Sequence, residues 1–337
     1  MTQGIFHLGD FRLHSGEVLH NAHISYETHG RLNADKSNVI LYPTWYAGTH
    51  DSNRTAIGSE RAMNPEEFFI VVPDMFANGL SSSPSNTDAP QDGPRFPIID
   101  VYDNVVAQHN LLRHKFGIEE IKLIVGFSMS AQQAFHWAAL YPEMVSAIAP
   151  ICGSAKTSTH NWLFLEGLRR ALTTDANFNN GDYQSPPKLG LRAFSTVYAG
   201  WFASQTFYRK NLHLSFGGTN FDDMDAFLQE AHDLFSKHDA NDLLGMLGTW
   251  QRADLGKHSR FNDDFAAALS SIRAKAIIMP CATDLYFPSQ DSEIEVAQMP
   301  NAELRVIPSE MGHLAGLPRM DREADKFIED ALSELLR

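Results

Sequence analysis

The sequence predicts an α/β protein with a mostly parallel central sheet, helices on both faces of the sheet, and an inserted helical cap. Short apolar runs alternate with longer segments of helical periodicity, an alternation typical of chains that build parallel sheets. The apolar runs carry few charges, as expected of strands buried on both faces. The alternation stops over residues 155–270. We therefore expect a core formed by residues 1–154 and 271–337, with the cap between them.

The expected elements follow one another in a regular order. The segment "FRLHSGEVLHNAHISYETHG" (11–30) indicates antiparallel strands that lead into the sheet. Six further strands are expected over residues 37–45, 66–75, 121–128, 145–153, 274–282 and 302–310. Helical periodicity predicts helices over residues 103–116, 131–142 and 321–336. The stretch 78–94 is rich in Ser, Asn, Pro and Gly, so we expect a polar surface loop there.

The cap segment is rich in aromatic residues, most of which are expected to form its own core. Its clearest helical pattern is "MDAFLQEAHDLFSKH" (224–238), and no part of it gives a convincing strand pattern.

Composition restricts the class of partner. The chain has 337 residues, of which 43% are hydrophobic, enough to bury a large core. Lys and Arg number 27 against 41 Asp and Glu, so the formal net charge is −14. A surface this acidic repels phosphate backbones, so we expect no nucleic-acid partner. We find no signal peptide and no run of ~18 apolar residues, and expect a cytoplasmic protein with no membrane partner.

Two cysteines, Cys152 and Cys281, each follow an apolar, strand-like run. We interpret them as small buried side chains in a reducing compartment, in preference to a disulfide or metal ligands. Neither CxxC nor HExxH spacing occurs, so the sequence gives no support for a metal site. We expect no cofactor.

A short motif, "VGFSMSA" (125–131), lies between the apolar run "IKLIV" and a helical segment. A Gly-x-Ser-x-small turn in this place holds the central residue in a strained conformation with its side chain exposed. Gly126 supplies one small neighbour, and Ser130 stands where glycine is commoner. The alternative is a serine that caps the helix, but Ser130 could cap it equally well. We therefore predict that Ser128 is a nucleophile.

A serine hydroxyl needs a base, and the base needs an orienting acid. After such an elbow the partners follow in the order Ser, Asp, His, each beyond a later strand. "CATDLYFP" after one strand offers Asp284, and "SEMGHLAGLP" after the next offers His313. Both lie at the carboxyl ends of strands, where open α/β sheets place their sites. The weaker candidates are Asp291, which is expected to start a helix, His136, which lies inside the elbow helix, and Glu310, which precedes the Gly-His turn.

The oxyanion formed during acyl transfer needs two hydrogen-bond donors already in place. The backbone N–H of Met129, directly after the nucleophile, is the first. The second is expected from the loop "TWYAGTH" after the strand "NVILYP", within residues 45–47, and we choose Tyr46.

Several segments together resemble the homoserine O-acyltransferase branch of the α/β-hydrolase superfamily. The resemblance covers nearly the whole chain and rests on "ISYETHGRLN" (24–33), "FPIIDVYDNVVAQHNLL" (96–112), "GFSMSAQQAFHWAALYPEMV" (126–145), "TTDANFNNGDYQSPPKLGL" (173–191), "TDLYFP" and "GHLAGL". It implies the α/β-hydrolase fold, a helical cap and a homodimer formed through that cap. It also implies that the nucleophile, acid and base are Ser128, Asp284 and His313, with Met129 and Tyr46 as oxyanion donors.

The chain departs from the family pattern around the reacting serine. Phe127, Ser130 and Ala131 replace three glycines of the family's elbow, and the oxyanion loop carries Trp45 and Tyr46 in an altered sequence. An aromatic group at Phe127 and a larger group at Ser130 reshape the floor of the site.

Further departures concern the acceptor amino acid. Homoserine-specific members carry an aspartate directly after the catalytic histidine, where this chain has Leu314. They also carry an arginine in the cap where this chain has Ser195, with Arg192 three residues earlier. A buried ammonium or carboxylate without a partner is costly. We therefore expect that free homoserine is not the preferred acceptor, and that Trp45, Phe127, Arg192 and Leu314 contact a different small acyl substrate.

Three functions are compatible with these residues. The first is a serine hydrolase that cleaves a small ester, thioester or lactone, and it is favoured because both acceptor-binding residues are lost. The second is an acyltransferase that moves an acyl group from acyl-CoA, as co-substrate, to an alcohol. The third is a non-catalytic binding protein, which the presence of every triad residue type disfavours. An apolar site near Leu314, Ser195 and Arg192 would indicate an esterase, whereas a charged site would indicate an amino-acid acceptor.

Overall fold

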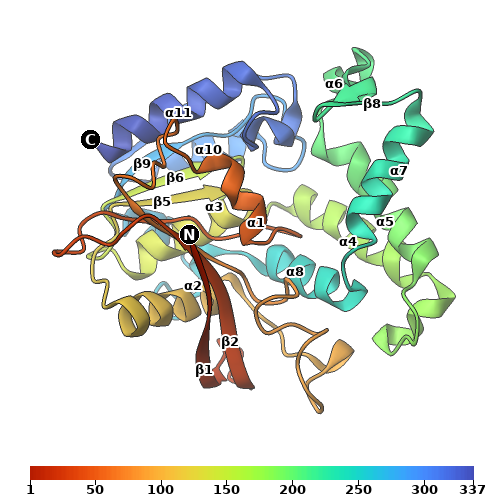
Figure 1. The fold of residues 1–337 in the computed structure, drawn as a ribbon, viewed down its shortest axis with the longest axis horizontal. Coiled ribbons are helices and arrows are strands. Elements are labelled where there is room, and N and C mark those ends of the chain that lie inside the picture. Colours follow the sequence, from red (N-terminus) through yellow and green to blue (C-terminus); the bar gives the residue numbers. More distant parts are fainter.

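The fold is built on one eight-stranded sheet, in a computed structural model that describes all 337 residues. The strand order is β1-β2-β4-β3-β5-β6-β9-β10 (Figure 1). Their bounds are β1 Thr2–Arg12, β2 Val18–His29, β3 Val39–Leu41, β4 Phe69–Pro73, β5 Leu123–Phe127, β6 Ala147–Ile151, β9 Lys275–Ile278 and β10 Ala302–Leu304. Strands β1 and β2 pair antiparallel, as do β2 and β4, whereas every pair from β4 to β10 is parallel. The predicted fold class is confirmed.

Helices cover both faces of the sheet. Their bounds are α1 His50–Asn53, α2 Val101–Asn110, α3 Met129–Leu140, α4 Thr159–Thr173, α5 Lys188–Phe202, α6 Gln205–Arg209, α7 Met224–Phe235, α8 Ala240–Arg252, α9 Phe265–Ser270, α10 Ser289–Val296 and α11 Arg322–Leu336. In β3, Val39 and Leu41 join the apolar cluster that contains residues of α2 and α3, while Ile40 joins the cluster that contains residues of α11. This two-residue period is the one expected of a strand covered on both sides.

Short helical turns connect these elements. They are η1 Arg54–Ala56, η2 Gly93–Arg95, η4 Ala176–Gly181, η5 Leu212–Leu214, η6 Leu255–Lys257 and η7 Gly312–Gly316. The helix predicted over 103–116 is α2 continued by a π-helical segment, η3 Leu111–Phe116. No helix combines the length and the apolarity needed to cross a bilayer.

Two local predictions are wrong. Residues 78–94 are not wholly a surface loop, because Ser81 and Ser83 are buried and hydrogen-bond to backbone carbonyls, Ser81 Oγ to Asp74 O (2.8 Å) and Ser83 Oγ to Ser81 O (2.6 Å). The cap also contains a small hairpin of β7 (Ser215–Phe216) and β8 (Thr219–Asn220). Its Gly-Gly turn is a recognised hairpin signal, but the strands are too short to give an alternating pattern.

The cap lies between β6 and β9 in the chain and contains α4 to α8; in Figure 1, α4 to α7 stand to the right of the sheet and α8 lies below it. Five of its buried aromatic residues share one apolar cluster with Tyr46, Met75 and Met129, so they join the cap to the core, namely Phe164, Phe178, Phe194, Phe235 and Trp250. Phe207 and Phe227 belong to a separate, smaller cluster.

The chain enters and leaves the cap at one place, where residues 155–157 run antiparallel to residues 253–255. Two backbone hydrogen bonds join these segments, from Thr157 N to Ala253 O (2.8 Å) and from Leu255 N to Ala155 O (3.1 Å). Leu255, Phe261 and Leu269 then pack in the main core cluster. The boundaries at 154 and 270 stay predictions, and these contacts favour an earlier end of the cap.

Candidate active site

Ser128 occupies the turn between β5 and α3, with φ 57° and ψ −126°. A non-glycine residue in this region is strained and persists only where its surroundings hold it. Gly126 and Gly153 allow the close approach, since a Cβ on Gly126 would lie 2.4 Å from Ser130 O and one on Gly153 would lie 2.4 Å from Ala131 Cβ. The Ser128 side chain does not cap α3. The capping alternative is therefore wrong, and the turn is a nucleophile elbow.

Asp284 and His313 come together from loops that follow β9 and β10. Both side chains are buried, and His313 Nδ1 lies 2.7 Å from Asp284 Oδ2. The other carboxylate oxygen accepts hydrogen bonds from the backbone N–H groups of Tyr286 and Phe287, each 3.0 Å long. An Nδ1–H that donates to the carboxylate leaves Nε2 free to accept a proton.

Aromatic rings hold the imidazole of His313 in place. Ring centroids lie 4.4 Å away for Tyr286, 4.7 Å for Phe127 and 5.6 Å for Phe287. Ser128 and His313 line the same cavity. The Ser128 hydroxyl makes no hydrogen bond here, and in enzymes without bound substrate such contacts are often long and tighten when substrate binds.

Two backbone N–H groups are candidate donors, one on Met129, directly after the serine, and one on Tyr46, which lines the same cavity. Met129 is the first residue of α3, and N–H groups of a first helical turn have no partner within the helix. The N–H of Tyr46 makes no hydrogen bond within the protein. The Tyr46 side chain anchors this loop, because its hydroxyl donates to Leu243 O (3.2 Å) and its ring stacks on Tyr198 with centroids 5.9 Å apart.

A buried polar cluster supports the same loop and was missed by the sequence analysis. Asp74 accepts hydrogen bonds from His50 N (2.9 Å), His50 Nδ1 (2.6 Å) and Asn78 Nδ2 (2.9 Å). Asn78 also donates to Gly48 O (3.1 Å). The hydrogen bond to Asp74 raises the pKa of the His50 imidazole, although burial opposes the shift. The sequence offered one indication of this cluster, because Asp74 directly follows β4 and His50 follows the loop that contains Tyr46.

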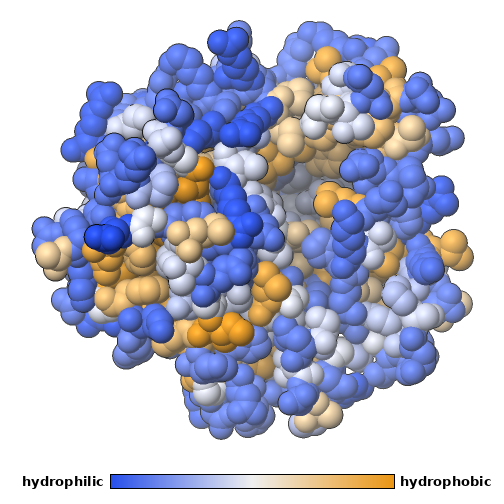
Figure 2. Space-filling view, in the orientation of Figure 1, coloured by the Kyte–Doolittle hydropathy of each residue, from blue (hydrophilic) through white to orange (hydrophobic).

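The cavity beside Ser128 has a volume of about 350 Å³ and is mainly apolar. Figure 2 shows a hollow with hydrophobic atoms between the core and the cap. Trp45, Phe127 and Leu314 line the cavity, and their contact with substrate stays a prediction. Apart from His313 and three tyrosines, the only ionisable side chain in the lining is that of Glu230, which is exposed. The lining residues contributed by the cap are Tyr198, Phe202, Phe216, Phe221, Phe227, Glu230, Ala231, Leu234 and Phe235.

Arg192 does not lie at this cavity, so the structure does not support the prediction that it contacts substrate. It is exposed on α5, and Ser195 is buried with its hydroxyl donating to Arg192 O (3.0 Å). Tyr198 and Phe202, one turn apart, form the face of α5 that lines the cavity. The sequence analysis placed Arg192 in the cap, but it predicted neither the helix α5 nor the direction in which this side chain points.

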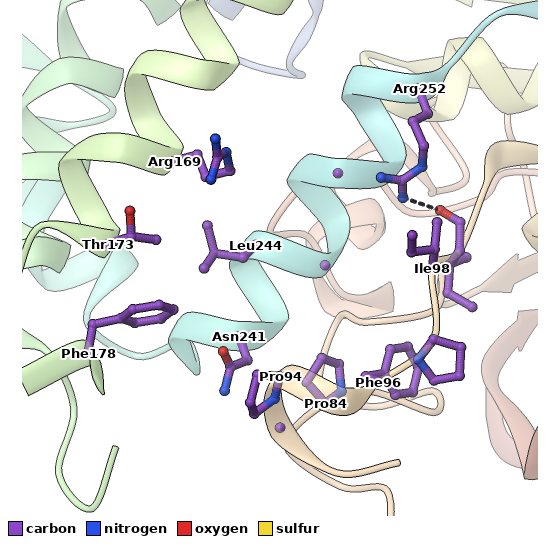
Figure 3. A pocket seen from close by; sticks show the side chains of 15 residues that line it. Pro84, Pro94, Phe96, Ile98, Arg169, Thr173, Phe178, Asn241, Leu244 and Arg252 are labelled. Atoms are coloured by element: carbon purple, nitrogen blue, oxygen red, sulfur yellow. Dashed lines mark hydrogen bonds between the residues drawn. The ribbon is translucent and has the colours of Figure 1, made fainter. Parts of the chain in front are cut away.

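A second cavity of about 320 Å³ lies between α4, α8 and residues 84–99 (Figure 3). Its two arginines are already paired, Arg169 with Glu166 and Arg252 with Asp100. Arg252 also donates to Ile99 O (2.9 Å). None of the predicted site residues lines this cavity.

Both cysteines are buried and free, as predicted. Ligand-type atoms of Cys152, Asp284 and His313 lie within 4.8 Å of one another. This set suits a metal poorly, because Asp284 and His313 are already bonded to each other and burial raises the pKa of the Cys152 thiol well above its usual range.

The elbow, the buried Asp–His pair and the cap together are the features of an α/β-hydrolase. The chain belongs to the alpha/beta hydrolase fold family, whose model matches residues 38–318. It is an enzyme of this class and lies in the branch that includes homoserine O-acetyltransferases.

Named relatives extend over almost the full chain. The chain is 39% identical to an ethyl acetate hydrolase of Pseudomonas veronii, over 98% of this chain and 95% of the relative. It is 38% identical to a probable esterase of Corynebacterium glutamicum, over 97% and 94%. A homoserine O-acetyltransferase of Chlorobaculum parvum is 31% identical, over 91% and 88%.

Solved structures agree with these matches. An acetylester hydrolase from Corynebacterium glutamicum superposes with a TM-score of 0.94 at 36% identity, covering 99% of this chain and 96% of that one. The acetyl esterase MekB superposes with a TM-score of 0.95 at 38% identity, covering 100% and 97%.

Proposed function

We propose that the chain is a serine esterase that hydrolyses small carboxylic esters through an acyl-enzyme on Ser128. The observation that carries this proposal is the apolar cavity beside Ser128, with Leu314 directly after the base. An ammonium or carboxylate of an amino-acid acceptor would lose its water there without gaining a buried charged partner, since Glu230 is exposed. The names of the two esterase relatives support acetic esters as the substrate class.

In the first half of the reaction, Ser128 Oγ attacks the ester carbonyl and His313 Nε2 takes the hydroxyl proton. Asp284 fixes the imidazole and stabilises its positive charge. The N–H groups of Met129 and Tyr46 bind the oxyanion, and loss of one such donor costs ~3 kcal/mol of transition-state stabilisation. The intermediate collapses as His313 returns the proton to the departing alcohol, which leaves an acylated Ser128.

In the second half, water attacks the acyl carbon and His313 takes one of its protons. Collapse of the second tetrahedral intermediate breaks the bond to Ser128 Oγ, which receives the proton, and the carboxylic acid leaves. Every step uses side chains and backbone groups of this chain, so the reaction needs no cofactor and no acyl-CoA.

Assays of acetyl transfer test this function. Purified protein incubated with ethyl acetate should release acetate, whereas acetyl-CoA with homoserine should give little O-acetylhomoserine. A Ser128→Ala variant should lose roughly 10⁴-fold or more of the hydrolytic rate. Production of O-acetylhomoserine faster than acetate would instead assign the chain to the acyltransferases, and full activity of the alanine variant would remove Ser128 from the mechanism.

A cytoplasmic homodimer formed through the cap is also part of this proposal. The two free, buried cysteines suit a reducing compartment. Exposed large apolar side chains occur on α4 and α5 of the cap, namely Trp162, Leu163, Leu189 and Val197. Such a patch favours association. Light scattering should give twice the mass of the 37.6 kDa chain, and Leu163→Glu should reduce that mass to one chain.

A further inference from the structure

Hydrolysis requires the cavity to hold a water molecule against the acyl-enzyme, although its walls are mostly aromatic. A water in a protein interior needs two to four polar partners. Among the cavity's polar side chains, Ser52 and Glu230 are exposed, and the Tyr46 hydroxyl is already bonded to Leu243 O. Besides Ser128, His313 and the indole N–H of Trp45, which can donate but cannot accept a hydrogen bond, this leaves the hydroxyls of Tyr286 and Tyr198.

The Tyr286 hydroxyl is buried and has no hydrogen-bond partner. Burial raises the pKa of Tyr286, and a weak interaction with the Tyr198 hydroxyl adds to the shift, but the geometry between the two hydroxyls falls short of a full hydrogen bond. Leaving such a group unpaired costs about 1–3 kcal/mol, which a phenylalanine at this position would avoid. The cost is offset if the hydroxyl binds a group that enters the cavity.

Tyr286 is rigidly held next to the base. Its ring centroid lies 4.4 Å from that of His313, and its backbone N–H donates to Asp284 (3.0 Å). The ring stacks on Phe164 with centroids 5.3 Å apart and planes 3° from parallel. Its hydroxyl therefore has a fixed place in the site.

Tyr198 provides a second phenol from the cap. It lines the same cavity, and its ring centroid lies 6.5 Å from that of Tyr286. Burial raises the pKa of both phenols, so both keep their protons at neutral pH and can donate hydrogen bonds.

We propose that the Tyr286 hydroxyl, assisted by Tyr198, binds the water molecule that attacks the acyl-enzyme. The proposal rests on the proposed esterase function and concerns only its second half. The bound water donates one proton to His313 Nε2 as its oxygen bonds to the acyl carbon. The bond to Ser128 Oγ then breaks, the proton passes to that oxygen, and the carboxylic acid leaves. The two phenols would favour hydrolysis over acyl transfer in an otherwise apolar site.

Tyr286→Phe removes the hydroxyl and keeps the ring. With p-nitrophenyl acetate, the fast release of nitrophenol that accompanies acylation should persist, while the later steady-state rate falls roughly tenfold. With butan-1-ol added, the ratio of butyl acetate to acetate should rise several-fold. The alcohol is held by contact of its alkyl chain with the aromatic lining, so it depends less on the phenol.

Two further variants sharpen the experiment. Tyr208→Phe is the matched control, since the Tyr208 hydroxyl donates to Ala199 O and does not line the cavity. It should leave both the rates and the product ratio unchanged. Tyr198→Phe should shift the product ratio in the same direction as Tyr286→Phe by a smaller factor, and it carries the test if Tyr286→Phe does not fold.

The outcomes separate the two proposals. An unchanged product ratio in folded Tyr286→Phe, or equal slowing of acylation and deacylation, overturns the role of the phenol and leaves the esterase intact. Failure of the wild-type protein to show an acetylated Ser128 peptide by mass spectrometry overturns the esterase itself.

Discussion

Asp284 uses both carboxylate oxygens, and this fixes the base more firmly than a single contact would. One oxygen faces His313 Nδ1, and the other accepts the N–H groups of Tyr286 and Phe287. In the loop "DLYF" (284–287), backbone N–H groups therefore bind the side-chain carboxylate of the loop's own first residue. These contacts hold the Asp284 carboxylate, the His313 imidazole and the Tyr286 ring in fixed positions relative to one another.

Substitution Asp284→Asn should lower kcat/KM for p-nitrophenyl acetate by roughly 10⁴-fold, because an amide no longer selects the histidine tautomer with a free Nε2. The fold should survive, since asparagine has nearly the same shape. Circular dichroism and ester hydrolysis measured on the same sample check both statements. A loss below tenfold would mean that another group orients His313.

Asp74 positions the oxyanion loop through His50 and Asn78 without touching the cavity itself. Substitution Asp74→Asn should lower kcat by roughly tenfold, because the charge-assisted bond to His50 is lost and the Tyr46 N–H is less well placed. KM should change little, since the cavity walls remain. A rise in KM at unchanged kcat would contradict this positioning role.

At the scale of elements, the turn between β5 and α3 depends on space as much as on dihedral angles. Gly126 lies in β5, where the backbone of Ser130 and Ala131 comes closest. This close approach is what lets the helix begin directly after the serine and presents the Met129 N–H.

Substitution Gly126→Ala should destabilise the protein by about 1–3 kcal/mol, because the added methyl would lie 2.4 Å from Ser130 O. Activity should fall with it as the elbow shifts. The matched control is Gly200→Ala in α5, where a Cβ meets nothing within 4 Å. That variant should be neutral or gain up to ~1 kcal/mol of helix propensity. Urea denaturation of both variants measures the difference, and equal stabilities would refute the crowding argument.

The sequence predicted elements better than it predicted contacts between them. Strand–helix alternation and the VGFSMSA turn were visible because they are local patterns. The Asp74–His50 pair was not, since its members are 24 residues apart and meet only through the order of β3 and β4. The direction of the Arg192 side chain was missed because the sequence predicted no helix at 188–202, and the side of α5 that meets the cavity depends on how the cap packs on the core. Ser81 and Ser83 were misjudged because polar side chains can be buried wherever backbone carbonyls accept their hydroxyls.

At the scale of the whole molecule, buried ionisable groups link stability to pH. His136 lies in α3 inside the core, and burial lowers its pKa to about 4. An unfolded chain binds this proton near the ordinary value of 6.5. As the pH falls from 6.5 toward 4, the unfolded state gains a proton that the folded state does not, so stability is fully present above 6.5 and is lost below it.

This linkage predicts that His136 accounts for ~2 kcal/mol of the stability lost between about pH 8 and about pH 5. A His136→Gln variant should lose correspondingly less free energy of unfolding over that interval than wild type. Urea denaturation at both pH values gives the comparison. An identical acid-induced loss in both proteins would show that the histidine is not the group responsible.

The paired segments 155–157 and 253–255 have a consequence for how this protein can evolve. The cap leaves and rejoins the core at this one pair of segments. Its length and sequence can therefore change while the strands of the sheet keep their register. The aromatic side chains that line the cavity come largely from that insertion, whereas Ser128, Asp284 and His313 lie on turns and loops that follow strands of the sheet. Mutations in the cap can therefore change which substrates enter the cavity without changing Ser128, Asp284 or His313.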